Sequence, residues 1–294
     1  MNLQFLPENN ATAPNSVGVR LDFGYDGTEF SGWAVQPGLR TVQGEFEDAL
    51  ARVLRAPSRL TAAGRTDAGV HARRQVAHLD IPMASWEQLP GRSDRQPTQA
   101  LLDRITAVLP KDIVVTNVQK ANPGFDARFS AGSRRYTYRI ADTPAARNAL
   151  NSHYVLRWRH KLDITAMDEA ARLLVGLNDF AAYCKPRPDA TTIRRLITFA
   201  WRRPETGADQ GLAVATIRAD AFCHNMVRAL VGAAIKVGEG KQPISYPYDV
   251  LLSRQREQAA AIVPAHGLTL EEVTYPPPPF DAERATQIRA KRRL

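Results

Sequence analysis

The stretch Ala63-Gly-Arg-Thr-Asp67-Ala-Gly-Val-His71-Ala72 sets one carboxylate in a loop of small residues. Residues 58–63 can run extended before it, and residues 75–81 alternate between apolar and polar side chains, so we expect a strand on each side. Gly64 and Gly69 let such a loop turn sharply and let a ligand approach the backbone. Arg65 is close enough in sequence to hold the Asp67 carboxylate ionised or to reach a phosphate. On these residues alone, Asp67 is either a functional carboxylate or a turn residue that bonds its own backbone.

Other motifs along the chain favour the functional interpretation. Residues 64–72 resemble the catalytic-aspartate motif of the TruA-type tRNA pseudouridine synthases. The remaining motifs resemble the same family, in the family's order, across about residues 17–275: Tyr25-Asp-Gly-Thr-Glu-Phe-Ser-Gly-Trp33, Arg40-Thr-Val-Gln-Gly44, Phe125-Asp-Ala-Arg-Phe-Ser130, Arg134-Arg-Tyr-Thr-Tyr138, Gly176-Leu-Asn-Asp-Phe180, Ala221-Phe-Cys-His-Asn-Met-Val-Arg228 and Pro264-Ala-His-Gly-Leu268. Each motif alone is a weak signal, but the ordered set is specific.

The composition is that of a globular protein, and its positive charge favours a polyanionic partner, although many basic proteins bind no nucleic acid. The chain has 294 residues, of which 44% are hydrophobic and 23% charged, and its net charge is +9. No apolar run is long enough to span a membrane, and no signal peptide is recognisable at the start. We therefore expect a cytoplasmic protein in which Cys184 and Cys223 are buried free thiols. No Cys/His cluster has the spacing of metal ligands.

The pattern of strands and helices predicts an α+β fold of two related subdomains. We expect a disordered arm over residues 1–15, one subdomain over 16–142 that carries the Asp67 loop, a second over 143–275, and a Pro-rich then basic tail over 276–294 that is solvated. Predicted strands cover residues 17–23, 113–118, 134–140, 193–201, 212–218 and 268–274, and predicted helices begin after Thr41 and cover 98–109, 164–175 and 222–237. Residues 86–97 read as a loop. The resemblance implies one long mixed, largely antiparallel sheet with helices on one side and a central basic cleft.

The resemblance also implies a reaction. Such an enzyme isomerises uridine to pseudouridine in the anticodon stem-loop of tRNA, at positions 38 to 40, and acts as a homodimer. The bond between ribose C1′ and uracil N1 breaks, the base turns, and C5 joins C1′. This isomerisation has no net redox change, so we expect no cofactor and no metal. Asp67 is the implied nucleophile; attack on the sugar, attack on the base and a glycal-like intermediate all stay open.

Four more residues are candidates: the resemblance gives roles to Arg228 and Tyr136, and side-chain chemistry suggests those of Arg65 and His71. Arg228 is the implied ion-pair partner of Asp67, although without the motif it reads as a surface arginine of an amphipathic helix. Tyr136 is the implied platform that stacks on the uracil and whose hydroxyl assists proton transfer, whereas Tyr138 reads as structural. Arg65 is expected to hold the flipped nucleotide. His71 is either a base or a residue that orders the loop.

The remaining basic candidates are phosphate contacts. Arg134 and Arg135 are predicted to bind substrate, with Arg20, Arg73 and Arg74 as further candidates, although solvated strand faces have the same pattern. One position departs from the family, because Thr106 stands where an asparagine is expected.

Two other functions fit parts of the sequence. A non-catalytic tRNA-binding or chaperone protein of the same fold would need the basic cleft and not Asp67. A nucleoside or sugar hydrolase would use Asp67 but lacks a second clear catalytic carboxylate.

Overall fold

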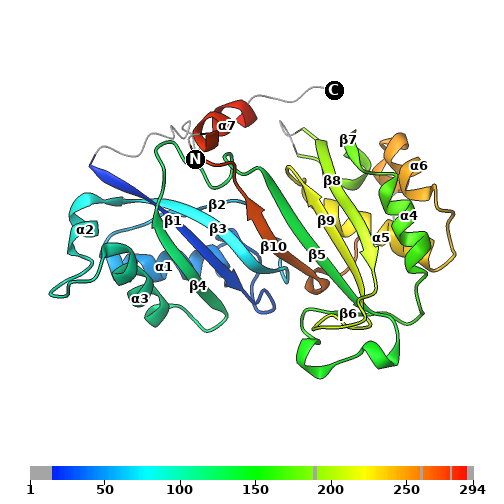
Figure 1. Ribbon diagram of the computed structural model, residues 1–294, viewed down its shortest axis with the longest axis horizontal. Helices are drawn as coiled ribbons and strands as arrows, with labels where there is room; N and C mark the ends of the chain where they lie inside the picture. The colour runs from blue at the N-terminus through cyan, green and yellow to red at the C-terminus, as the bar shows by residue number, and fades with distance from the viewer. Residues whose placement is uncertain (1–14, 188–190, 259–260, 279, 290–294) are drawn as a thin grey trace.

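A computed structural model describes residues 15–187, 191–258, 261–278 and 280–289. It contains one ten-stranded mixed sheet with helices packed against it, which confirms the predicted α+β class (Figure 1). The strands are β1 (Ser16–Tyr25), β2 (Thr61–Ala62), β3 (His71–Pro82), β4 (Ile113–Lys120), β5 (Ser133–Ala141), β6 (Leu156–Arg157), β7 (Gly176–Asp179), β8 (Ile193–Arg202), β9 (Ala213–Ala219) and β10 (Leu268–Thr274). Residues 1–14 of the predicted N-terminal arm lie outside the described residues.

The strand order places β10 at the centre of the sheet. Along the main path the order is β4-β1-β3-β10-β5-β9-β8-β7, while β2 pairs with β3 and β6 with β5. β10 runs antiparallel to β5 and parallel to β3, with Thr269 opposite His71. The other neighbours on that path are antiparallel. The last strand in the chain therefore joins the part of the sheet that carries the Asp67 loop to the part that carries β5 and β9.

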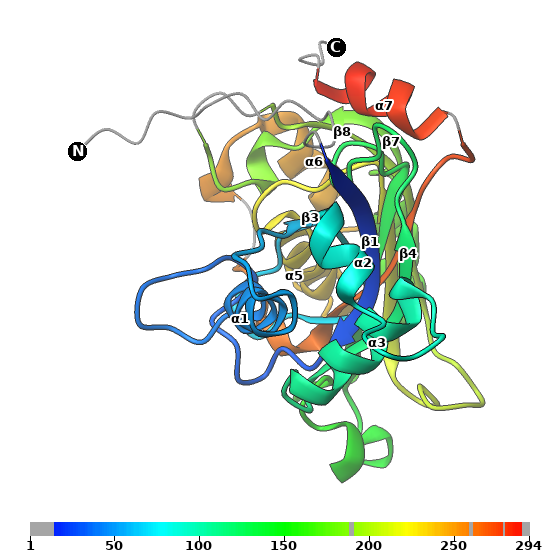
Figure 2. The same cartoon turned by 90° about the vertical axis from the view of Figure 1, so that its left-hand side faces the viewer.

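Two of the helices begin at a side chain that caps them. Thr41 accepts a hydrogen bond from the Gly44 amide, and Asp163 accepts one from the Ala166 amide, as the two predicted helix starts require. The helices are α1 (Val42–Leu54), α2 (Met83–Gln88), α3 (Pro97–Val108), α4 (Ile164–Arg172), α5 (Met226–Gly238), α6 (Tyr246–Ser253) and α7 (Phe280–Arg289). Short 3-10 turns occupy Pro144–Ala146, Ala149–Asn151, Ala181–Tyr183, Arg256–Gln258 and Ala265–Gly267. Figure 2 shows α1 and α5 on the same face of the sheet.

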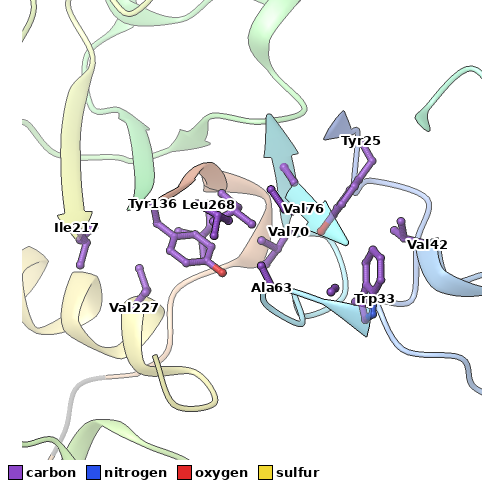
Figure 3. Close-up of a cluster of buried hydrophobic side chains, with 14 of the residues drawn as sticks. Tyr25, Trp33, Val42, Ala63, Val70, Val76, Tyr136, Ile217, Val227 and Leu268 are labelled. Carbon is purple, nitrogen blue, oxygen red and sulfur yellow. The ribbon is translucent and has the colours of Figure 1, made fainter. Parts of the chain in front are cut away.

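One large hydrophobic cluster fills the space between this face and the helices. The rings of Phe23 and Phe46 lie 4.9 Å apart between their centroids, and Trp33 packs against Phe23 at 5.8 Å, so β1 and α1 share an aromatic core. Figure 3 shows that the cluster continues through Val70 to Tyr136, whose hydroxyl points toward Ala63. The core therefore runs directly beneath the Asp67 loop.

Four local predictions were wrong. Residues 83–88 form α2, although 86–97 reads as a loop. The helix predicted from residue 222 begins at Met226, because Asn225 has a left-handed φ of 67°. Residues 280–289 of the predicted solvated tail form α7, whose Arg284 Nε donates to Ala131 O at 3.0 Å. Cys184 and Cys223 are joined in a disulfide, with Cα atoms 5.5 Å apart, and are not free thiols. Of the helices that the structure describes, none has the length and apolar character needed to cross a membrane.

Candidate active site

A cavity of about 950 Å³ opens between the Asp67 loop, β5 and the segment that precedes α5. Its described lining contains far more positive than negative side chains. The arginines are Arg59, Arg65, Arg128, Arg134, Arg187, Arg194 and Arg228, and the carboxylates are Asp67 and Asp220. This lining corresponds to the basic cleft that the resemblance implies, and it favours an anionic ligand.

The connection between β1 and α1 holds the Asp67 loop in place. The Trp33 amide donates to Thr66 O at 3.0 Å, and the Thr66 hydroxyl lies 2.8 Å from the Tyr25 hydroxyl. Gly27 packs so closely that a Cβ there would lie 2.1 Å from the carbonyl oxygen of Val70. The motif over residues 25–33 is thus explained by contact with the Asp67 loop.

Asp67 faces partners that come from α5 and the segment before it. Arg228 Nη1 lies 3.2 Å from Asp67 Oδ2, so the ion pair expected from the resemblance is present. His224 Nε2 lies 3.3 Å from Oδ1 of the same carboxylate. The Asp67 side chain is 31% exposed, which leaves it accessible from the cavity. A cation on one oxygen and an imidazole beside the other thus hold the carboxylate at the cavity wall.

Tyr136 forms part of the cavity wall from β5. Its side chain is buried, and its ring packs edge-to-face against Phe222 with centroids 5.2 Å apart. Burial raises the pKa of Tyr136 well above its ordinary value, so the hydroxyl stays protonated at neutral pH. The neighbouring Tyr138 is also buried, and its hydroxyl donates to Pro264 O at 2.7 Å, as a structural residue would.

The predicted phosphate contacts separate into two groups. Arg65 is exposed and lines the cavity, whereas Arg135, Arg20, Arg73 and Arg74 are not among its lining residues. Arg135 alternates with Tyr136 along β5, so it lies on the opposite face of the sheet, where it pairs with Glu272 at 3.1 Å.

Arg134 lines the cavity but is engaged with the protein. Its guanidinium donates to Asp220 O at 2.8 Å and to Ala63 O at 2.7 Å, and it also donates to Arg128 O. These carbonyls belong to three separate loops around the cavity. The geometry favours a role in holding the loops together over the predicted phosphate contact.

His71 and Thr106 lie outside the described cavity lining. The His71 ring accepts a hydrogen bond from the Gly27 amide at 3.0 Å and lies 3.2 Å from His153 O through Nε2. Burial lowers the pKa of His71, and its contacts favour the loop-ordering role over that of a base. Thr106 is exposed on α3, so the departure from the family does not alter the lining.

Sequence reasoning assigned no role to His224 or to four of the arginines that line the cavity, Arg59, Arg128, Arg187 and Arg194. One signal was present, because His224 and Arg228 are four residues apart within one quoted motif. Arg128 also lies within a quoted motif, residues 125–130, whereas no comparable signal marks Arg59, Arg187 and Arg194. Among the described residues, no three His, Cys, Asp or Glu side chains gather as metal ligands.

Comparison with known proteins agrees with this geometry. A family model described as tRNA pseudouridine synthase matches residues 170–276. The chain is 50% identical over 284 residues to tRNA pseudouridine synthase A of Streptomyces griseus, an alignment that covers 96% of each chain. It is 51% identical over 278 residues to the protein of the same name from Frankia casuarinae, covering 94% of this chain and 96% of the relative. The relative from Corynebacterium glutamicum is 46% identical over 276 residues. Identity at this level over nearly the whole length, together with the motifs around Asp67, shows that the chain belongs to the tRNA pseudouridine synthase A family.

Proposed function

We propose that this enzyme, an isomerase by its family, converts uridine to pseudouridine at positions 38 to 40 of the tRNA anticodon stem-loop, with Asp67 as the essential carboxylate. The observation that carries the proposal is the meeting of Asp67 and Arg228 at 3.2 Å in a cavity lined by arginines. Neither rival function has a specific observation in its favour.

The reaction needs a nucleophile or an anionic stabiliser beside the reacting bond. The bond between C1′ and N1 breaks, C5 forms the new bond to C1′, the C5 proton leaves, and N1 gains a proton. Asp67 supplies the carboxylate, and Arg228 pairs with it at 3.2 Å. Because Arg228 Nε also donates to Val263 O at 2.7 Å, the guanidinium is fixed on its far side.

Tyr136 would bind the flipped base, and Arg65 would bind the phosphate of the same nucleotide or fill the space the base has left. The Tyr136 ring provides a flat apolar surface for a uracil that has left its stack, an interaction worth about 1–3 kcal/mol. Its protonated hydroxyl can donate a hydrogen bond to the base. Arg65 is exposed at the cavity, where a planar guanidinium can fill the vacated stack or bind the phosphate of the flipped nucleotide.

We further propose that the enzyme works in the cytoplasm as a homodimer, on the basis of the family resemblance. Light scattering on the purified protein tests the assembly. A mass of twice the 32.5 kDa chain is expected, and a mass of one chain at micromolar concentration would reject the dimer.

The decisive experiment measures tritium release from tRNA labelled at uridine C5. Because C5 loses its hydrogen when it joins C1′, release reports the rearrangement itself. Wild-type protein should release tritium and Asp67→Asn should not, while tRNA binding changes little because phosphates dominate affinity. Asp80→Asn, at an exposed position of β3, is the matched control and should behave as wild type. Bound tRNA without release by wild-type protein would support the non-catalytic rival, and free uracil would support the hydrolase.

A further inference from the structure

The Asp67 carboxylate has a separate partner at each oxygen. Arg228 approaches Oδ2 at 3.2 Å, and His224 approaches Oδ1 at 3.3 Å. In the part of the chain that the structure describes, these are the two side chains paired with Asp67. Both lie in the cavity lining; His224 belongs to the segment that leads into α5, and Arg228 to the first turn of α5.

Arg228 alone leaves the orientation of the carboxylate loosely set. It reaches Asp67 through Nη1 only, because its Nε is directed to Val263 O. A guanidinium that binds a carboxylate through one nitrogen lacks the two parallel bonds that fix the carboxylate plane. The torsion about the Cβ–Cγ bond of aspartate is broad, so a single contact permits the two oxygens to rotate. A second polar group beside the other oxygen restricts this rotation.

The backbone around His224 is fixed by contacts that do not involve Asp67. The Lys185 amide donates to His224 O at 2.9 Å. The preceding residue, Cys223, is tied to Cys184 by the disulfide. The following residue, Asn225, turns the chain with a φ of 67° before α5 begins. The imidazole is therefore presented to Asp67 from a segment that is anchored on both sides.

We propose that His224 is a positioning residue that, together with Arg228, fixes the plane of the Asp67 carboxylate toward the substrate. The inference rests on the proposed function, since it concerns the orientation of the attacking or stabilising carboxylate. His224 acts through Asp67 and is given no contact with the reacting atoms. A displacement of about 1 Å at a reacting group can cost about 100-fold in rate, so loss of this contact should lower turnover far more than substrate binding.

The test compares three variants in the tritium-release assay. His224→Phe keeps an aromatic ring but removes the donor, and we expect kcat to fall about 10- to 100-fold with KM and the tRNA Kd within about twofold of wild type. His224→Gln places an amide N–H near the position of the imidazole Nε2 and should recover most of kcat. His160→Phe makes the same substitution at an exposed histidine outside the cavity lining and should match wild type.

The outcomes separate this inference from the proposed function. Wild-type kcat in His224→Phe, with wild-type protein active, would overturn the inference alone. No tritium release by wild-type protein would overturn the proposed function. Equal losses of kcat in His224→Phe and His224→Gln, with unchanged melting temperatures, would also reject positioning by a polar contact with Oδ1. If His224→Phe fails to fold, the comparison of His224→Ala with His224→Gln decides in the same way, because only the latter carries a donor.

Discussion

Arg134 and Arg135 are neighbours on β5, yet they should respond very differently to replacement by methionine. Arg134 is 7% exposed and donates to the carbonyl oxygens of Asp220 and Ala63 at 2.8 and 2.7 Å, and also to that of Arg128. The Arg135 side chain is 36% exposed and forms one ion pair with Glu272. The two positions offer a matched pair of identical substitutions.

The expected magnitudes follow from what each guanidinium leaves behind. Arg134→Met removes the donor from three carbonyls, of which those of Asp220 and Ala63 accept in buried hydrogen bonds, and each unpaired buried acceptor costs about 1–3 kcal/mol. Part of this cost is recovered because a desolvated cation, whose pKa is lowered by burial, is also removed. We expect the free energy of unfolding to fall by about 2–5 kcal/mol. Arg135→Met removes a half-exposed ion pair, which contributes about 0–1 kcal/mol.

Urea denaturation measures the difference in the free energy of unfolding between Arg134→Met and Arg135→Met, provided that the slope of free energy against urea is the same for both variants. The salt dependence of tRNA binding is the second measurement. Because Arg134 directs its donors to carbonyls, Arg134→Met should leave the slope of log Kd against log salt as in wild type. If Arg134→Met is as stable as Arg135→Met and its slope of log Kd for tRNA against log salt is smaller than that of wild type, this reasoning is refuted and Arg134 is a phosphate contact.

Three further perturbations test other parts of the structure. Tyr136→Phe should keep tRNA affinity, since the ring still stacks, but lower tritium release; full activity would exclude a role for the hydroxyl. Reduction of the disulfide between Cys184 and Cys223, which are 39 residues apart, should lower the free energy of unfolding by about 2–4 kcal/mol, and a Cys184→Ala variant should lose its sensitivity to dithiothreitol. Burial lowers the pKa of His71, so the unfolded chain takes up a proton below about pH 6.5 that the folded state resists, and the melting temperature should fall between pH 7 and pH 5. His71→Gln should weaken this fall, and an unchanged pH dependence would contradict the assignment.

Local signals predicted much of the fold because the relevant interactions are short in sequence. Thr41 and Asp163 cap their helices through amides three residues away, which a sequence displays directly. The strand before and the strand after the Asp67 loop follow from alternation and glycine placement. By contrast, α7 has no apolar stripe, and its Arg284 donates to carbonyls more than 150 residues earlier in the chain. No local sequence pattern therefore predicts this helix.

Site residues that the family resemblance names were predicted. The sequence did not predict which face of the sheet each β5 side chain occupies, because that depends on strand pairing. The alternation of β5 indicates that Arg134 and Arg135 lie on opposite faces, but not which face meets the Asp67 loop. That choice depends on the pairing of β5 with β9 and β10, which join residues far apart in the chain. The sequence did not identify His224 for a related reason: its contact with Asp67 joins two loops on opposite sides of β10.

The position of β10 has a consequence for the nascent chain. Until residues 268–274 leave the ribosome, the strands that carry the Asp67 loop and those that carry β5 and β9 have no strand between them. At synthesis rates of about 5–20 residues per second, roughly 10–40 s separate the emergence of β3 from that of β10. During this interval the edges of β3 and β5 lack their shared neighbour and can pair with other chains. A nascent polypeptide without residues 268–274 therefore holds Asp67 and Arg228 but lacks the strand that joins their two parts of the sheet.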